Sequence, residues 1–178
     1  MERTIIYIII ILTVTYIIYK ITRPAITIKK PKHGILGANI IYSDEEGGKL
    51  LVSDKYDLQG KPDYIFQRIL GGSYIPVELK SASIKEDQNY PHEGDLMQLA
   101  AYFLIVEDLY GKRPKQGRLI YKNKMFIIKN TRSIRKEVNK HLKDMRRMLD
   151  TGKGEVKPSF PKCRNCVCRG TVCEWYEE

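Results

Sequence analysis

The stretch PDYIFQRILGGSYIPVELK, residues 62–80, decides the fold of this chain. Two runs with alternating apolar residues flank a Gly-Gly-Ser segment at positions 71–73, a pattern that predicts two antiparallel strands joined by a turn. Because side chains alternate along a strand, Glu78 and Lys80 should share one face of the second strand. The opposite face, directed toward the core, should then carry Ile75, Val77 and Leu79.

The same hairpin brings together side chains suited to phosphodiester chemistry. It should place Asp63, on the first strand, close to Glu78 on the second. Two carboxylates at one point repel each other unless a divalent cation lies between them, and hard oxygen ligands suit Mg²⁺ or Mn²⁺. With Lys80 beside them, the acids suit hydrolysis of a phosphodiester bond. The alternative is an ordinary solvated ion pair between Glu78 and Lys80.

The remaining patterns predict further hairpins and helices. The chain should form a hairpin over residues 39–53, a helix over 89–111, a hairpin over 117–130 and an amphipathic helix over 131–152. This order of elements predicts an α/β or α+β fold, in which helices cover a sheet.

The first residues differ in composition from the rest. Residues 5–21 are almost entirely apolar and contain one charge, which predicts a transmembrane helix over residues 1–23. A basic linker over 24–38 follows, and its charges predict a single-pass protein whose catalytic domain lies in the cytoplasm. The alternative is that the apolar run forms a buried strand or helix.

The charge balance favours a polyanionic partner. The chain has 31 Lys and Arg residues against 21 Asp and Glu residues, a net charge of +10. Such an excess favours binding to nucleic acid or to an anionic membrane surface, and charge does not distinguish the two.

Two further groups of residues carry candidate chemistry. In the predicted helix over 89–111, Gln98 and Tyr102 are spaced to lie on one face, where an amide can hold a phosphate or base edge and a ring can stack on an unpaired base. The alternative is an ordinary half-polar helix. A cysteine cluster near the C-terminus could hold zinc or an iron–sulfur cluster; its members are Cys163, Cys166, Cys168 and Cys173.

The ordered set GKPD, VELK, QLAAY and a cysteine cluster ending in CEW resembles the RecB-type nucleases of the PD-(D/E)XK superfamily. The likeness is greatest to the fourth CRISPR-associated (Cas) protein family, a group of exonucleases. It implies a restriction-endonuclease-like mixed sheet flanked by helices. It also implies that Asp63, Glu78 and the Leu79 carbonyl bind the divalent metal. Lys80 would be the catalytic lysine, and Gln98 and Tyr102 would lie near the DNA.

The sequence departs from this family at two points. The family commonly has a metal-binding histidine in an N-terminal helix, and here His33 is the one histidine upstream of Asp63. His92, near the start of the predicted helix over 89–111, is a second candidate. The family's [4Fe–4S] cluster uses one early cysteine, which this chain lacks, so Cys168 would have to be the fourth ligand; zinc is the alternative.

Together these observations predict a nuclease core over 39–158 and a Cys-rich segment over 159–178. The expected activity is a metal-dependent DNA exonuclease that prefers single-stranded ends. The resemblance adds a role in CRISPR spacer acquisition, with the CRISPR adaptation proteins as partners. The alternatives are a repair or defence nuclease outside CRISPR and a catalytically silent DNA-binding protein tethered to the membrane.

Overall fold

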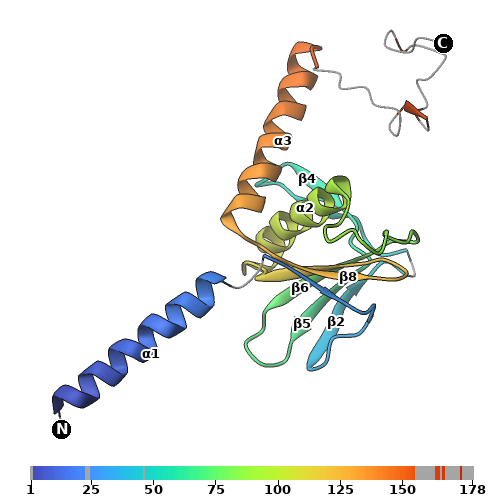
Figure 1. The fold of residues 1–178 in the computed structure, drawn as a ribbon. Helices are drawn as coiled ribbons and strands as arrows, with labels where there is room; N and C mark the ends of the chain where they lie inside the picture. The colour runs from blue at the N-terminus through green and yellow to red at the C-terminus, as the bar shows by residue number, and fades with distance from the viewer. Residues whose placement is uncertain are drawn as a thin grey trace. The chain divides into compact units, whose positions relative to one another are not determined.

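The computed structural model describes residues 2–22, 25–45 and 47–154, together with residues 163, 164, 166 and 173. It confirms the α/β prediction, because a six-stranded mixed sheet is combined with three helices (Figure 1). The helices are α1 (Glu2–Thr22), α2 (Glu93–Tyr110) and α3 (Arg132–Thr151). The strands are β1 (Ile26–Lys29), β2 (Ala38–Ser43), β3 (Leu51–Ser53), β4 (Leu58–Gly60), β5 (Tyr64–Arg68), β6 (Tyr74–Leu79), β7 (Gln116–Ile120) and β8 (Met125–Lys129). The chain forms two compact units, Met1–Val138 and Asn139–Glu178, and the first contains the whole sheet.

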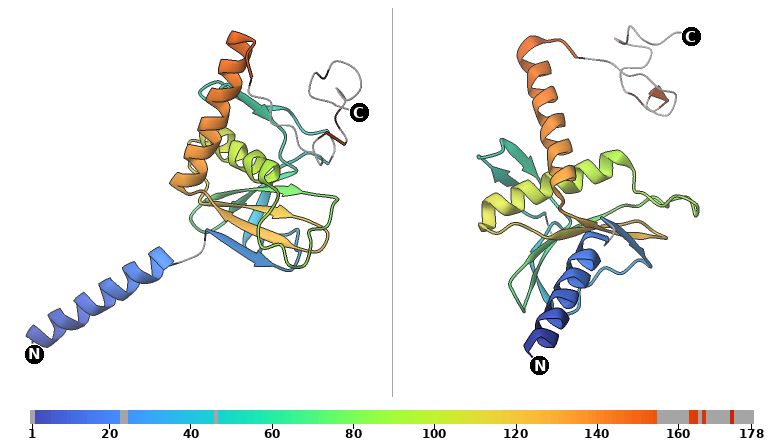
Figure 2. Two further views of the ribbon diagram at one scale, coloured as in Figure 1. Left: turned by 45° about the horizontal axis from the view of Figure 1, so that its top comes forward. Right: turned by 60° about the vertical axis from the view of Figure 1, so that its left-hand side comes forward.

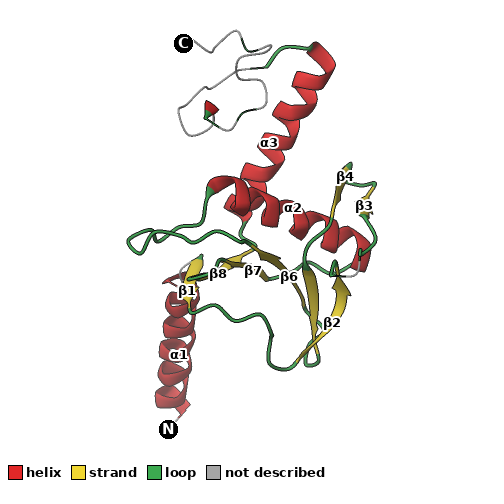
Figure 3. Cartoon of the chain, turned by 90° about the vertical axis from the view of Figure 1, so that its right-hand side faces the viewer, coloured by secondary structure: helices red, strands yellow, loops and turns green. Residues whose placement is uncertain are grey.

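The main sheet has the strand order β1-β8-β7-β6-β5-β2 (Figure 3). The central pair, β6 and β7, is parallel, and the other neighbouring strands are antiparallel. The predicted β5–β6 hairpin is confirmed, with Gln67 opposite Tyr74 and positive φ angles at Gly71 and Gly72 in the turn. The hairpin predicted over 117–130 is confirmed as β7 and β8.

The hairpin predicted over residues 39–53 is wrong. Instead, β2 pairs with β5 and extends the main sheet, while β3 pairs with β4 in a separate two-stranded sheet. An isolated two-stranded hairpin is marginally stable, whereas pairing with β5 joins β2 to strands that have a buried core face. The segment predicted as a basic linker also enters the sheet, because its residues Ile26–Lys29 form the edge strand β1.

Helix α2 packs on one face of the main sheet (Figure 2). Leu99 and Phe103 are fully buried there, and a Cβ atom built on Gly117 of β7 would lie only 2.9 Å from each of their side chains. Glycine at this position therefore allows the close approach of helix and strand. The other face of the sheet contributes to a buried cluster, in agreement with the alternation predicted for the second strand; its members are Ile35, Phe66, Ile75, Val77, Ile120 and Met125.

The helix limits follow local signals. Helix α2 begins after His92, which provides no side-chain cap, and ends at Gly111 with a φ of 63°. Helix α3 buries Ile134 and Val138 and is followed by Gly152, which has a φ of 65°. In both cases a glycine ends the helix because it adopts the left-handed conformation at little cost.

The predicted membrane anchor is wrong. Among the described residues, no helix is both long enough and sufficiently apolar to span a bilayer. In α1, the apolar part whose side chains are described is residues 4–18. At a rise of about 1.5 Å per residue this part covers about 22 Å, against a hydrocarbon core of about 30 Å. The prediction of a single-pass membrane protein with a cytoplasmic catalytic domain is corrected accordingly.

Candidate active site

A polar cluster lies where β6 ends and α2 begins. Asp63 directly precedes β5, and the hairpin sets it beside the end of β6, where its Oδ2 accepts a hydrogen bond of 2.6 Å from the backbone N–H of Leu79. Glu78 and Lys80 extend from the same end of β6. The structure thus brings together the acid–acid–lysine set that the sequence predicted for the hairpin.

The Lys80 ammonium occupies the centre of this cluster. Its Nζ donates hydrogen bonds to Glu78 Oε1 at 3.1 Å and to Gln98 Oε1 at 2.6 Å, and it lies 3.1 Å from Asp95 Oδ1. An ammonium has three donors, so all of them are engaged. Burial lowers the pKa of Lys80, but the hydrogen bonds to Glu78 and Asp95 outweigh it and leave the pKa raised. Lys80 is therefore a positioned, protonated cation.

Glu78 is the buried acid of the cluster, with 7% of its surface exposed. Its Oε1 accepts hydrogen bonds from Lys80 and from Gln98 Nε2, whereas its Oε2 is buried and has no hydrogen-bond partner among the described residues. Burial is the largest cause raising the pKa of Glu78, and the charge of Asp63 adds to it.

These two acids fit a divalent cation. A buried carboxylate oxygen without a partner destabilises the fold, and a cation bound there would satisfy it. The residues that could hold such an ion are Asp63 and Glu78, with the Leu79 carbonyl that the resemblance adds. The unpartnered Oε2 of Glu78 is the structural observation that supports this assignment.

Gln98 and Tyr102 lie inside the cluster and bond to its members rather than facing outward. Gln98 Nε2 donates to the Tyr102 hydroxyl at 2.8 Å, and that hydroxyl donates to the Lys61 carbonyl at 3.0 Å. Tyr102 is only 5% exposed, and burial is the main reason that its pKa is raised to about 12. In this structure the ring has no open face, and its hydroxyl holds Gln98 in place. The predicted contact of Gln98 and Tyr102 with DNA stays a prediction.

The sequence did not reveal the roles of Asp95 and Tyr121. The Tyr121 hydroxyl donates to Asp95 Oδ2 at 2.5 Å, and Asp95 Oδ1 in turn pairs with Lys80. For Asp95 the sequence held one signal: Asp95 and Gln98 are three residues apart on α2, so they lie on the same side of the helix. No local pattern marked Tyr121, because it follows β7, far from Asp95 in the sequence.

The two histidines considered as metal ligands have different surroundings. His33 is exposed in the segment between β1 and β2. The His92 ring lies edge-on to Tyr121, with 6.0 Å between ring centroids, and its backbone N–H donates to the Tyr121 hydroxyl at 3.4 Å. His92 is therefore in contact with the residue that holds Asp95.

The cysteine cluster lies largely outside the described residues. Of its four members, Cys163, Cys166 and Cys173 are described and Cys168 is not. The Cys166 amide donates to the Cys163 carbonyl at 3.2 Å, so a turn joins these two residues, and no disulfide joins the three that are described. The predicted metal cluster stays a prediction.

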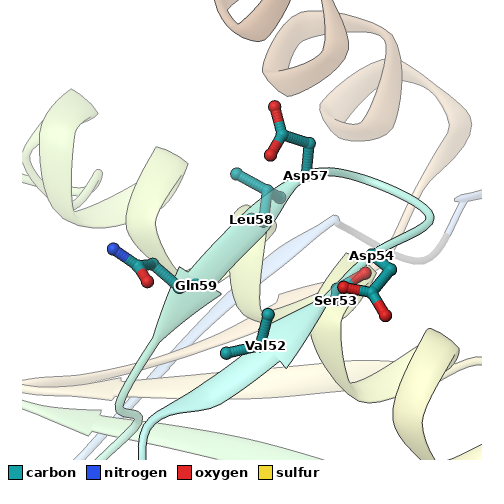
Figure 4. A pocket seen from close by; sticks show the side chains of 6 residues that line it. All are labelled: Val52, Ser53, Asp54, Asp57, Leu58 and Gln59. Carbon is teal, nitrogen blue, oxygen red and sulfur yellow. The ribbon is translucent and has the colours of Figure 1, made fainter.

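A pocket of about 370 Å³ lies along the β3–β4 hairpin (Figure 4). Asp54 and Asp57 are its charged residues, and the hydroxyl of Ser53 in its wall donates to Asp108 at 2.6 Å. No residue of the Lys80 cluster lines it, so this pocket is separate from the candidate active site.

No family model matches the sequence, and no curated protein matches it significantly. The chemistry of the site must therefore be inferred from its own residues. The carboxylates of Asp63, Glu78 and Asp95 outnumber the single Lys80 ammonium, so the site is acidic and suits a bound divalent cation. Such a cation and Lys80 together would place two positive groups at one point. Such a site suits a substrate that develops negative charge during reaction, as a phosphodiester does.

Proposed function

We propose that this chain is a metal-dependent deoxyribonuclease of the RecB type within the PD-(D/E)XK superfamily. The observation that carries the proposal is that the buried Oε2 of Glu78 makes no hydrogen bond with any described group, at a site that also holds Asp63. The mixed sheet, with α2 packed on one face, is consistent with it. Action on single-stranded ends, and a place in CRISPR adaptation, are the parts of the proposal that derive from the motif resemblance.

The proposed reaction is hydrolysis of a phosphodiester. A water oxygen forms a bond to phosphorus, and the bond from phosphorus to one deoxyribose oxygen breaks. The products are a phosphate monoester and a free hydroxyl, and the protons of the water are divided between them and the solvent. A Mg²⁺ or Mn²⁺ ion held by Asp63 and Glu78 would polarise the phosphoryl oxygen and acidify the attacking water.

Lys80 stabilises charge in this mechanism rather than accepting a proton. Its pKa is raised, so it is protonated at neutral pH. All three of its donors are engaged in this structure, and an arriving phosphate oxygen must replace one acceptor. The contacts with Asp95 and Glu78, both at 3.1 Å, are longer than the 2.6 Å contact with Gln98, and Glu78 is the proposed metal ligand. Exchange of Asp95 for phosphate would keep Lys80 attached to Glu78 and Gln98.

The test is a nuclease assay of the purified full-length chain with Mg²⁺, Mn²⁺ or EDTA. The substrates are linear single-stranded DNA labelled at either end and circular single-stranded DNA, which only an endonuclease cuts. Glu78→Gln and Lys80→Met should each reduce the cleavage rate by about 10² or more, the typical cost of removing a stabilising group from a transition state. The exposed Glu86→Gln should be as active as the wild type. Wild-type activity in a folded Glu78→Gln protein would refute the assignment.

A further inference from the structure

A second pocket, of about 340 Å³, lies at the turn of the β5–β6 hairpin and beside the loop that follows α2. Four of its lining residues are cations, and no carboxylate lines it; these are Arg68, Lys112, Arg113 and Lys115. Asp63 and Arg68 are five residues apart along β5, or about 17 Å at the rise of a strand. The pocket is therefore at the opposite end of this strand from the candidate active site.

The positive charge of this pocket is not compensated within the described part of the chain. The Lys112 ammonium donates to the Gly71 carbonyl at 2.5 Å, and Arg113 donates to the Asn130 carbonyl at 3.0 Å, so both are hydrogen-bonded to neutral groups. None of the four cations forms an ion pair with a described acid. Like charges that line one pocket repel each other, and a bound anion would relieve the repulsion.

A fifth cation, Arg118, adds to the positive electrostatic potential near this pocket. Arg118 lies on β7, where it donates to the Gly34 carbonyl at 3.2 Å. Burial, and then the charge of Arg68, lower the pKa of Arg118. The positive charge of Arg68 thus acts on Arg118, which is consistent with an anion site on this side of the sheet.

The backbone around the pocket is held in place before any ligand binds. Gly71 and Gly72 have positive φ angles, which fix the turn of the hairpin. The Asn130 side chain donates to the Pro114 carbonyl at 2.9 Å, and its backbone N–H donates to the Lys115 carbonyl at 3.0 Å. Preorganised donors reduce the ordering cost of binding.

The size and walls of the pocket indicate what it holds. A volume of about 340 Å³ is at the small end of the range for ligand sites, about 300–1,000 Å³. Besides the cations, the lining includes Tyr74, whose ring packs on Tyr110 with 4.7 Å between centroids, and the largely exposed Leu70. Guanidinium and ammonium groups recognise phosphate oxygens, while an aromatic and an aliphatic side chain suit a base or sugar.

We propose that this pocket binds a phosphate ester of nucleotide size, either a free nucleotide or the phosphate of a nucleic acid strand. The proposal goes beyond the nuclease activity and does not depend on it, because none of the residues of the Lys80 cluster lines the pocket.

The experiment is calorimetric titration of the full-length chain in EDTA, which prevents metal-dependent cleavage. The probes are deoxythymidine monophosphate, thymidine without phosphate, and a 5′-phosphorylated thymidine tetranucleotide. The test variant is Arg68→Ala/Lys115→Ala, because these two cations are exposed, whereas Lys112 and Arg113 hold backbone carbonyls. The control, Lys55→Ala/Lys85→Ala, removes the same charge from exposed positions outside the pocket. Thermal unfolding checks that both variants are folded.

The monophosphate should bind the wild type, and the pocket variant should weaken that binding by about tenfold or more, as the loss of charge-assisted hydrogen bonds predicts. The control variant should stay within about twofold of the wild type, and thymidine should bind far more weakly than its monophosphate. Tighter binding of the tetranucleotide than of the monophosphate would identify a strand as the ligand, and the reverse order a free nucleotide. Equal weakening by both variants, or thymidine binding as tight as that of its monophosphate, would overturn the proposal. Because no cleavage is measured, a failure of the nuclease assay leaves this result unaffected.

Discussion

The Lys80 ammonium lies 3.1 Å from the carboxylate of Asp95, and the same carboxylate accepts a 2.5 Å hydrogen bond from Tyr121. This chain of contacts joins the end of β6, the first turn of α2 and the residue after β7. It forms because β6 and β7 are parallel, so that both strands end at the same edge of the sheet. The lysine is thus positioned by three separate elements of the fold.

Asp95→Asn should lower the pKa of Lys80, because the negative charge of Asp95 is one of the causes that raise it. If Lys80 acts protonated in cleavage, the alkaline limb of the pH–rate profile should shift to lower pH. NMR titration of the Lys80 side chain measures the same pKa without any activity.

Tyr121→Phe is the matched control for this change, since it removes the hydroxyl but keeps the charge of Asp95. The alkaline limb of the pH–rate profile of Tyr121→Phe should therefore stay closer to that of the wild type. An unchanged Lys80 pKa in Asp95→Asn would show that the ion pair does not position this lysine.

Glu78→Gln should make the protein more stable at neutral pH. The pKa of Glu78 is raised in the folded state, mainly by burial, so the folded chain binds more protons than the unfolded chain just above the usual glutamate pKa of 4.5. Wild-type stability should therefore fall as pH rises through this window, whereas glutamine has no such dependence. Urea unfolding at pH 4 and pH 7.5 should show a difference between variant and wild type that grows with pH. The cost of burying the charge of Glu78 is the main cause of this difference.

The exposed Glu86→Gln serves as the control for this prediction and should change the stability at neither pH. A Glu78→Gln protein less stable than the wild type at pH 7.5 would show that the carboxylate gains more from Lys80 and Gln98 than it loses by burial.

Local patterns predicted where helices and strands form better than they predicted which strands pair with each other. The alternation in residues 62–80 predicted the β5–β6 hairpin and its core face. Start and stop signals predicted α2, and apolar spacing predicted α3. The same alternation in β2 did not indicate whether its partner would be β3 or β5. Pairing depends on which strand offers a buried face, a property of the assembled sheet. The apolar N-terminal run was misread as a membrane span because its composition resembles one.

The residues of the candidate site could likewise be predicted only where they lie on one local element. The sequence predicted that Asp63, Glu78 and Lys80 would meet, because one hairpin carries all three. It did not predict that Gln98 would bond to both Glu78 and Lys80. Helical spacing gives the face on which a side chain lies, but whether that face is buried against the site or open to a ligand depends on the packing of the helix against the sheet.

Tyr102→Phe should destabilise the chain by about 1–3 kcal/mol, the cost of leaving buried polar groups without partners. The groups left unpaired are the Lys61 carbonyl and one donor of Gln98. Urea unfolding at pH 7 measures the change. Tyr90→Phe is the matched control, because Tyr90 is 69% exposed and its loss of a hydroxyl should have little effect. Equal stability of the two variants would contradict the supporting role assigned to Tyr102.

The cysteine cluster predicts bound metal in anaerobically purified protein, with an iron–sulfur cluster favoured by the resemblance and zinc as the alternative. Iron, sulfide and zinc analysis distinguishes the two. Because the chain lacks the family's early cysteine, Cys168→Ser should remove the fourth thiolate and reduce the metal content. A Cys168→Ser protein with the full metal content would show that Cys168 is not a ligand.

Two glycine-to-alanine changes should have opposite effects on stability. A Cβ atom on Gly60 would lie 2.8 Å from Cε1 of Tyr102, a ring that is already buried. The ring must move, and overpacking of this kind costs about 1–3 kcal/mol. A Cβ atom on Gly94, in the first turn of α2, would have no described neighbour within 4 Å, so alanine there should stabilise the chain by up to about 1 kcal/mol.

The Gly60→Ala change should also displace side chains of the candidate active site, because the Tyr102 hydroxyl bonds to Gln98 and Gln98 bonds to Lys80. Urea unfolding of the two variants measures stability, and NMR titration of Lys80 measures the displacement of its surroundings. The NMR chemical shift of the Lys80 side chain should change in Gly60→Ala and should be unchanged in Gly94→Ala. If Gly60→Ala matches the wild type in both measurements, the ring of Tyr102 has room to move, and Gln98 is not held in position through it.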